Sequence, residues 1–123
     1  MTHCGWNSVL EGISAGMPIL TWPFVYEQFI NEKLLVEVIG CAAKVWDGGK
    51  RSTREEEHAL VPGSAIAHAV FKFMEPVGDD YVAMRSKAHN VAVSALAAVQ
   101  EGGSSHGDVK DLVNDLFGLI GNK

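Results

Sequence analysis

The chain has 123 residues, a hydrophobic share of 47% and a formal net charge of −5. This length suits one compact domain, and the hydrophobic share is enough to build a packed core. The acidic balance argues against a nucleic-acid partner, because binding to the phosphate backbone needs clustered Lys and Arg, whereas the ten basic residues here are scattered.

The first predicted elements are a short helix and a short strand. The helix covers residues 7–15, with Asn7 or Ser8 as its N-cap and Gly16 as its stop. Residues 19–22 form an apolar run between two prolines. A run of this length and setting predicts a buried parallel strand.

A second helix and strand follow in the same order. Residues 27–39 predict a helix that ends at Gly40, and residues 42–46 predict a strand closed by a turn at 47–49. The hydrophobic face of this helix would consist of Phe29, Ile30, Leu34, Leu35, Val38 and Ile39. Alternation of strand and helix is typical of right-handed parallel units with helices on both faces of the sheet.

The rest of the chain is predicted to be mostly helical. Residues 48–58 are polar and predict a loop, and helices are expected at about 64–74, 79–100 and 108–120. The glycine-rich segment 102–105 breaks the chain before the last of them. We therefore expect an α/β fold with a partial Rossmann-like parallel sheet and flanking helices.

The two cysteines, Cys4 and Cys41, are too few for a disulfide framework or a four-ligand zinc site. They predict free thiols and a reducing, cytoplasmic setting. The sequence has no signal-peptide pattern and no run of about 20 apolar residues, so we expect a soluble protein without a membrane partner. The sequence begins, at Met1, inside its most informative motif. We therefore expect the chain to be part of a longer protein.

The first motif predicts an anion site. A strand that ends at His3, a flexible Gly5 and a helix start at Asn7 and Ser8 together present backbone N–H groups and side-chain donors, which suit a phosphate. His3 would lie at the carboxyl end of its strand, where open parallel sheets bind ligands. Glu11 projects one turn further along the helix. Its carboxylate can accept hydrogen bonds from a vicinal diol such as a ribose.

A second polar pair, Glu27 and Gln28, begins the next predicted helix. The topology directs this pair to the same crevice, where an acid and an amide suit the hydroxyls of a pyranose. These local arguments leave other interpretations open, because helix starts with Asn and Ser are common.

The order and spacing of these residues resemble the signature of plant secondary-product UDP-glycosyltransferases. The segments that match are His3-Cys4-Gly5-Trp6-Asn7-Ser8, Leu10-Glu11-Gly12, Ala15-Gly16, Thr21-Trp22-Pro23, Glu27-Gln28 and Asn31-Glu32-Lys33. Residues 101–105 and the last helix are similar to the C-terminal region of that family, while residues 47–75 match only loosely.

The resemblance implies a two-domain GT-B fold, in which residues 1–123 form part of the C-terminal half that holds a UDP-sugar. Helix 108–120 would pack toward the N-terminal domain. The implied contacts, from the diphosphate through the ribose to the transferred sugar, are His3, Asn7 and Ser8, then Glu11, then Glu27 and Gln28, with the backbone of Trp6 near the sugar.

The resemblance also implies an inverting transfer of sugar to small hydroxylated lipophilic acceptors, with UDP-sugar as co-substrate and without a metal or other cofactor. Gln28 is what glucose-using members usually have, so UDP-glucose is the expected donor. The Trp and Gln with which the family holds the nucleoside lie upstream of His3 and have no counterpart here. The catalytic His belongs to the N-terminal domain, so no histidine of this chain is assigned that role.

Two other function classes share some of these features. The chain could be a non-catalytic module that binds a nucleotide-sugar or pairs with a separate chain. A dinucleotide-binding oxidoreductase domain is disfavoured, because the G-x-G-x-x-G turn is missing and only Gly5 stands in its place. Trp22 and Trp46 are expected in the core and not as stacking platforms.

Overall fold

The computed structural model describes residues 1–48, 52, 54–75 and 77–121. Strands β1 (Ile19–Thr21) and β2 (Ala42–Lys44) pair in parallel, with Ile19 opposite Ala42. On the other side of β1, Thr2 donates to the carbonyl of Leu20 at 3.0 Å and accepts from the N–H of Trp22 at 2.9 Å. The parallel sheet is confirmed, and the strand expected to end at His3 consists of this single bridge at Thr2.

Helix α1 (Trp6–Ser14) is capped at both ends by backbone groups. Its N-cap is Gly5 and no side chain caps it, so the prediction of Asn7 or Ser8 as the cap is wrong. Gly16 stops the helix, as predicted, and adopts a left-handed φ of +64°. There the N–H of Gly16 donates to Ile13 at 2.9 Å and that of Met17 to Gly12 at 3.4 Å, the two bonds of a Schellman motif.

Helix α2 (Gln28–Lys33) continues into a π-helical segment, η1 (Leu34–Ile39), and ends at Gly40 in the left-handed region. The end was predicted correctly, but the buried face only in part: of the predicted residues Leu35 is fully buried, and Phe29, Leu34 and Ile39 are half-buried. Ile30 and Val38 are 71% and 74% exposed, whereas the fully or nearly buried residues are Asn31, Glu32 and Leu35. Helical periodicity missed part of this face because a π segment has a wider turn than the 3.6-residue repeat and because Asn31 and Glu32 form buried hydrogen bonds.

Both of these helices contact the same face of β1. Ile19 and Thr21 point to one side of the strand, since side chains alternate. A Cβ on Gly12 of α1 would come within 2.7 Å of the Ile19 side chain, and the Thr21 hydroxyl bonds to Glu32 of α2. The expectation of helices on both faces therefore fails for α1 and α2. The strands follow one another in a single direction, and right-handed connections then place their helices on one side.

Four further helical elements follow in the described part of the chain. They are the short 3-10 turn η2 (Glu55–Glu57), α3 (Gly63–Met74), α4 (Asp79–Val99) and α5 (Ser104–Gly121). The expected ranges agree closely for α3 and α4. Helix α5 starts four residues earlier than predicted, because the tight turn between the helices is already complete at Gly103, whose N–H donates to the Gln100 carbonyl at 2.8 Å. The predicted turn at 47–49 and loop at 48–58 lie partly outside the described residues.

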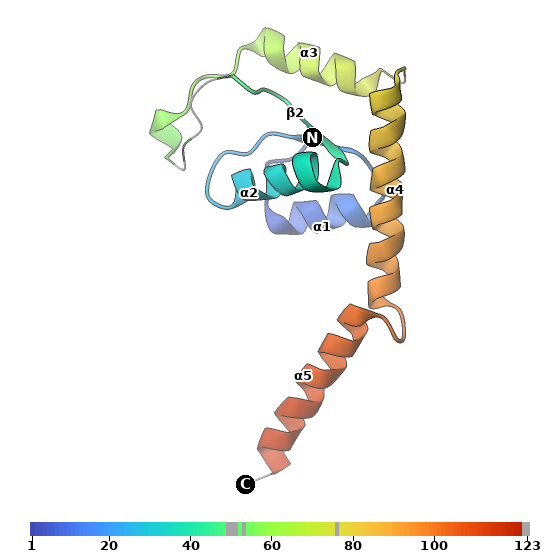
Figure 1. Cartoon of the computed structure of the whole chain (residues 1–123). Coiled ribbons are helices and arrows are strands. Elements are labelled where there is room, and N and C mark those ends of the chain that lie inside the picture. The colour runs from blue at the N-terminus through green and yellow to red at the C-terminus, as the bar shows by residue number, and fades with distance from the viewer. Residues whose placement is uncertain (49–51, 53, 76, 122–123) are drawn as a thin grey trace.

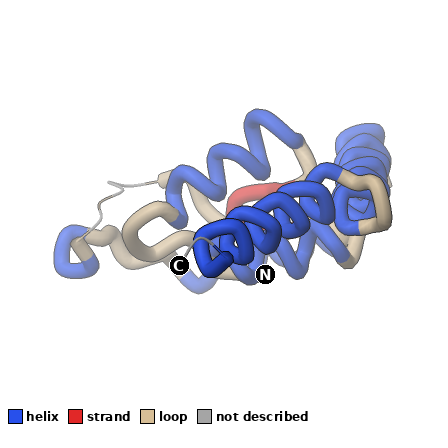
Figure 2. The backbone as a smooth tube through the Cα atoms, turned by 90° about the horizontal axis from the view of Figure 1, so that it is seen from below, coloured by secondary structure: helices blue, strands red, loops and turns tan. Residues whose placement is uncertain are grey.

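Helix α4 closes the amino edge of the sheet. It packs against α1, and its residues meet the two turns that lead into the strands: Ala92 lies by Gly16, before β1, and Lys87 lies by Gly40, before β2. The strands lie between helices in the view from below (Figure 2). The core is the cluster Cys4, Val9, Ile19, Leu35, Cys41, Ala42 and Ala88. The carboxyl edge of the sheet is thus the side away from α4.

Helix α5 extends from the end of α4 away from the α/β body, and its last turn lies far from the strands (Figure 1). The hydrophobic stripe that the sequence predicts on this helix is exposed, at residues Val109, Leu112, Val113, Leu116 and Phe117. None of the helices in the described ranges combines the length and apolar character that crossing a membrane requires.

Two leucines test where the core lies. Leu35 is 0% exposed and Leu116 is 51% exposed. Leu35→Ala should lower the free energy of unfolding by about 2–5 kcal/mol, because it leaves a cavity in the core. In the 123-residue chain, where Leu116 is exposed, Leu116→Ala is the matched control and should change this free energy by no more than about 0.5 kcal/mol. Urea unfolding followed by circular dichroism gives both values. Equal losses would place the core elsewhere.

Candidate functional site

The residues that the sequence singles out lie at the carboxyl edge of the sheet or on the helices that start there. His3 follows the bridge at Thr2, and Trp6, Asn7 and Ser8 form the first turn of α1. The second group lies beyond β1, where Glu27 is the N-cap of α2 and Gln28 its first residue. The exposed members are His3, Trp6, Asn7, Glu11 and Glu27, while Ser8 and Gln28 are half-buried.

Gly5 allows the His3 ring to lie against the start of α1. A Cβ at position 5 would come within 2.5 Å of Nε2 of His3, so any other residue would push the ring away. The carbonyl of Gly5 accepts the N–H of Val9 at 3.0 Å, which is the first helical bond. The three preceding N–H groups, of Trp6, Asn7 and Ser8, belong to the turn that has no acceptor within a helix. Together with the imidazole they form a cluster of donors suited to an anion.

The backbone of Cys4 is in an unusual conformation just before this turn. Its φ is +66°, a region that non-glycine residues rarely adopt. The N–H of Cys4 donates to the Thr2 hydroxyl at 3.3 Å, and its carbonyl accepts from the Asn31 side chain at 2.9 Å. The Cys4 side chain is fully buried and His3 is exposed, so the left-handed turn at Cys4 separates the thiol from the imidazole.

Gln28 organises the loop between β1 and α2. Its side-chain carbonyl accepts the backbone N–H groups of Phe24 at 2.9 Å and Val25 at 3.1 Å. In the same loop, Tyr26 has a left-handed φ of +54°. The side-chain carbonyl of Gln28 thus supports the loop, and its two N–H donors are the part of the amide that can address a ligand. Contact between Gln28 and a sugar stays a prediction.

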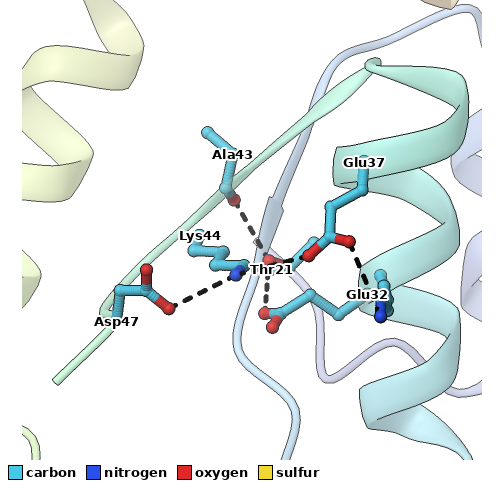
Figure 3. Close-up of polar contacts among 7 residues, drawn as sticks. Thr21, Glu32, Glu37, Ala43, Lys44 and Asp47 are labelled. Carbon is cyan, nitrogen blue, oxygen red and sulfur yellow. Dashed lines mark hydrogen bonds and ion pairs between the residues drawn. The ribbon is translucent and has the colours of Figure 1, made fainter.

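A buried contact joins α2 to the end of β1. The Thr21 hydroxyl donates to the Glu32 carboxylate at 2.7 Å and lies 3.1 Å from the carbonyl oxygen of Ala43 (Figure 3). Thr21 and Glu32 are each only 1% exposed. Such a satisfied buried pair fixes relative positions more than it adds stability, because desolvation of the carboxylate offsets much of the gain.

Around this contact the charges are solvent-accessible. Lys44 of β2 lies 4.0 Å from Glu37 and 3.3 Å from Asp47 (Figure 3), and exposed ion pairs of this kind contribute little to stability. Within the described ranges no group of three or more His, Cys, Asp and Glu residues is placed to hold a metal ion.

A cavity of about 310 Å³ lies beside the predicted site, between the ends of both strands and residues 58–61. Its aromatic lining consists of Trp22, Phe24, Phe29, Trp46 and His58. The two tryptophans are half-buried in its wall, so the prediction of core positions for them is wrong. The residues predicted to bind the UDP-sugar are not among those that line it, which separates this cavity from the donor cluster at the start of α1.

Comparison with known proteins decides the family. Residues 1–60 match the family described as UDP-glucoronosyl and UDP-glucosyl transferase. The chain is 43% identical over 121 residues to UDP-glycosyltransferase 73C6 of Arabidopsis thaliana and 45% identical over 117 residues to an abscisate beta-glucosyltransferase of Phaseolus angularis. The alignments cover 97% and 94% of this chain and 24% of each relative. The chain belongs to the UDP-glycosyltransferase family.

Solved structures agree with this assignment. Glycyrrhiza uralensis UGT73P12, complexed with glycyrrhetinic acid 3-O-monoglucuronide, superposes with a TM-score of 0.83 at 34% identity, over 97% of this chain and 24% of that one. Phytolacca americana UGT2, complexed with UDP-2fluoro-glucose and pterostilbene, gives 0.73 at 32% identity, over 93% and 24%. This UDP-glycosyltransferase chain therefore has the fold of about a quarter of such an enzyme.

In this UDP-glycosyltransferase chain the thiol of Cys4 stays protonated, and hence weakly nucleophilic, near neutral pH. Burial raises its pKa from 9.0 to about 11, and the nearby Glu32 carboxylate acts in the same direction, while a backbone hydrogen bond at Trp22 lowers it. Burial also raises the pKa of Cys41. Since the thiolate is the nucleophilic form, neither thiol is suited to catalysis near neutral pH.

The raised pKa of Cys4 predicts a pH dependence of stability. The folded chain keeps the thiol proton up to about pH 11, whereas the unfolded chain loses it around pH 9.0. The stability that the neutral thiol contributes is thus complete below pH 9 and is lost as the pH rises toward 11. Unfolding measured at several pH values should show a steeper fall for the wild type than for Cys4→Ala. Parallel profiles would contradict the burial of this thiol.

Proposed function

We propose that this chain binds the UDP-sugar donor of a glycosyltransferase and forms part of the C-terminal half of a two-domain GT-B enzyme. The observation that carries the proposal is the cluster of donors at the carboxyl edge of the sheet, where His3 lies against the first turn of α1. Open parallel sheets bind ligands at this edge. A structural neighbour complexed with UDP-2fluoro-glucose lends further support.

The diphosphate would be held by the first turn of α1. The backbone N–H groups there, the Ser8 hydroxyl, the Asn7 amide and the His3 ring are all donors, and the positive end of the helix dipole favours a negative ligand. The carboxylate of Glu11, one turn further along, would accept hydrogen bonds from the ribose hydroxyls. We assign Glu27 and the N–H donors of Gln28 to the transferred sugar, with the backbone of Trp6 nearby.

The chemistry follows from this placement. An acceptor hydroxyl attacks the anomeric carbon of the sugar, the bond to the UDP oxygen breaks, and negative charge develops on the leaving diphosphate. Donors already aimed at that oxygen stabilise the charge in the transition state. We propose that the reaction is inverting and needs no metal, since the helix start and His3 supply the charge stabilisation. The base that deprotonates the acceptor would come from the N-terminal domain.

Relatives indicate the class of substrates. Glucosyl transfer appears in the name of the abscisate beta-glucosyltransferase, and together with Gln28 it supports UDP-glucose as donor. Abscisate and pterostilbene, named for that relative and for a structural neighbour, support a small, hydroxylated, lipophilic acceptor. We also propose that the exposed stripe of α5 packs against the N-terminal domain, because Leu112, Val113 and Leu116 are 59%, 42% and 51% exposed.

The donor assignment is tested at Glu11. Glu11→Ala in the full-length protein should weaken binding of UDP-glucose by roughly 2–4 kcal/mol, because hydrogen bonds to a charged group contribute about 1.5–3 kcal/mol each and two would be lost. Glu101→Ala removes a matched exposed carboxylate between α4 and α5 and should leave binding unchanged. Calorimetric titration gives both affinities. Equal affinities of the wild type and Glu11→Ala for UDP-glucose would show that Glu11 does not contact the donor.

A further inference from the structure

The side chain of Asn31 reaches from α2 to the loop that carries His3. Its amide nitrogen donates to the carbonyl of Cys4 at 2.9 Å, across 27 positions of the sequence. Asn31 is only 7% exposed and Cys4 is 0% exposed, so water does not compete with this bond. A bond of this kind fixes the distance and the orientation between two elements.

The bond acts where the backbone is strained. Cys4 has a φ of +66°, which costs free energy for a residue with a Cβ and persists only where surrounding contacts hold it. Those contacts are the Thr2 hydroxyl on the N–H side and Asn31 on the carbonyl side. The left-handed turn at Cys4 brings the chain directly into the extended N-cap Gly5, over which the His3 ring lies.

We propose that Asn31 is a positioning residue for the donor diphosphate: it holds Cys4 in the left-handed conformation and so aims His3 and the first turn of α1 at the phosphates. The inference rests on the proposed donor site. Asn31 lies in the helix that begins with Gln28, so the same rigid element would present the sugar-binding pair and fix the phosphate-binding loop. The two parts of the donor site are thereby held in one geometry.

Asn31→Asp is the sharpest test, because it keeps the shape of the side chain and replaces the N–H donor by an oxygen. Asn31→Ala removes the donor without adding charge and covers the case in which the buried carboxylate prevents folding. Ile30→Ala, at the neighbouring exposed position of α2, is the matched control. Each variant is compared with the wild type by calorimetric titration with UDP in the full-length protein and by thermal unfolding.

We expect the two Asn31 variants to bind UDP about tenfold more weakly at temperatures well below their unfolding transitions, and Ile30→Ala to bind as the wild type does. A merely structural role would lower the unfolding temperature and leave the affinity of the folded protein unchanged. A wild-type protein that fails to bind UDP would overturn the proposed function itself. Unchanged affinity in the Asn31 variants of a wild type that binds would overturn this inference alone.

A variant of Cys4 tests whether Asn31 affects UDP binding through the Cys4 backbone. Glycine tolerates a positive φ without the cost that a Cβ brings, so Cys4→Gly removes the strain that Asn31 holds in place. In the Cys4→Gly background, the loss of UDP affinity on Asn31→Asp should shrink to about twofold. An undiminished loss in that background would show that Asn31 does not act through the Cys4 backbone, and the inference would fail.

Discussion

The pairing of β1 with both of its neighbours is the constraint on which the rest of the structure depends. Its backbone bonds to Thr2 on one side and to β2 on the other, so all three segments run in the same direction and leave the sheet at the same edge. The loops that carry His3, Gln28 and Trp46 are therefore gathered at one side, although they are far apart in sequence. Helix α4 covers the opposite edge, which leaves the carboxyl edge for a ligand.

Helix α2 is oriented by polar contacts as much as by hydrophobic ones. Asn31 bonds to the loop before α1, and Glu32 bonds to Thr21 at the end of β1. These two bonds turn a polar pair into the interior and place Ile30 in solvent. Stability alone would favour the reverse arrangement, because buried polar groups are costly to desolvate. This arrangement fixes the position of α2 relative to the loop that carries His3, and it does so at the expense of burying Ile30.

The sequence allowed the elements with local signals to be predicted. Gly16 and Gly40 end their helices because each takes a left-handed φ that glycine favours, and β1 is a short apolar run between prolines. The burial of Asn31 and Glu32 on α2 could not be predicted, because it depends on hydrogen bonds to distant segments. Nor could the N-cap of α1, which follows the left-handed turn at Cys4. Helical periodicity carries no information on a π-helical segment or on a hydrogen bond from Asn31 to Cys4.

In the candidate site, too, the features with local sequence signals were predicted and those that depend on long-range contacts were not. The polar residues at the starts of α1 and α2 were predicted from their positions after strands, together with a family resemblance that the comparisons confirm. The roles of Gly5 in accommodating the His3 ring and of Gln28 in supporting its own loop became visible only in three dimensions. The aromatic cavity had no sequence signal, since its walls come from segments separated by polar residues.

Mapping the bound donor by NMR tests the central claim most directly. Titration of the ¹⁵N-labelled protein with UDP-glucose should shift the backbone amides from Gly5 to Ser8 and those of Glu27 and Gln28, because a ligand at the carboxyl edge changes their hydrogen bonding. Amides along α5 should stay in place. Shifts confined to the aromatic cavity around Trp46 and His58, with none at the start of α1, would contradict the account.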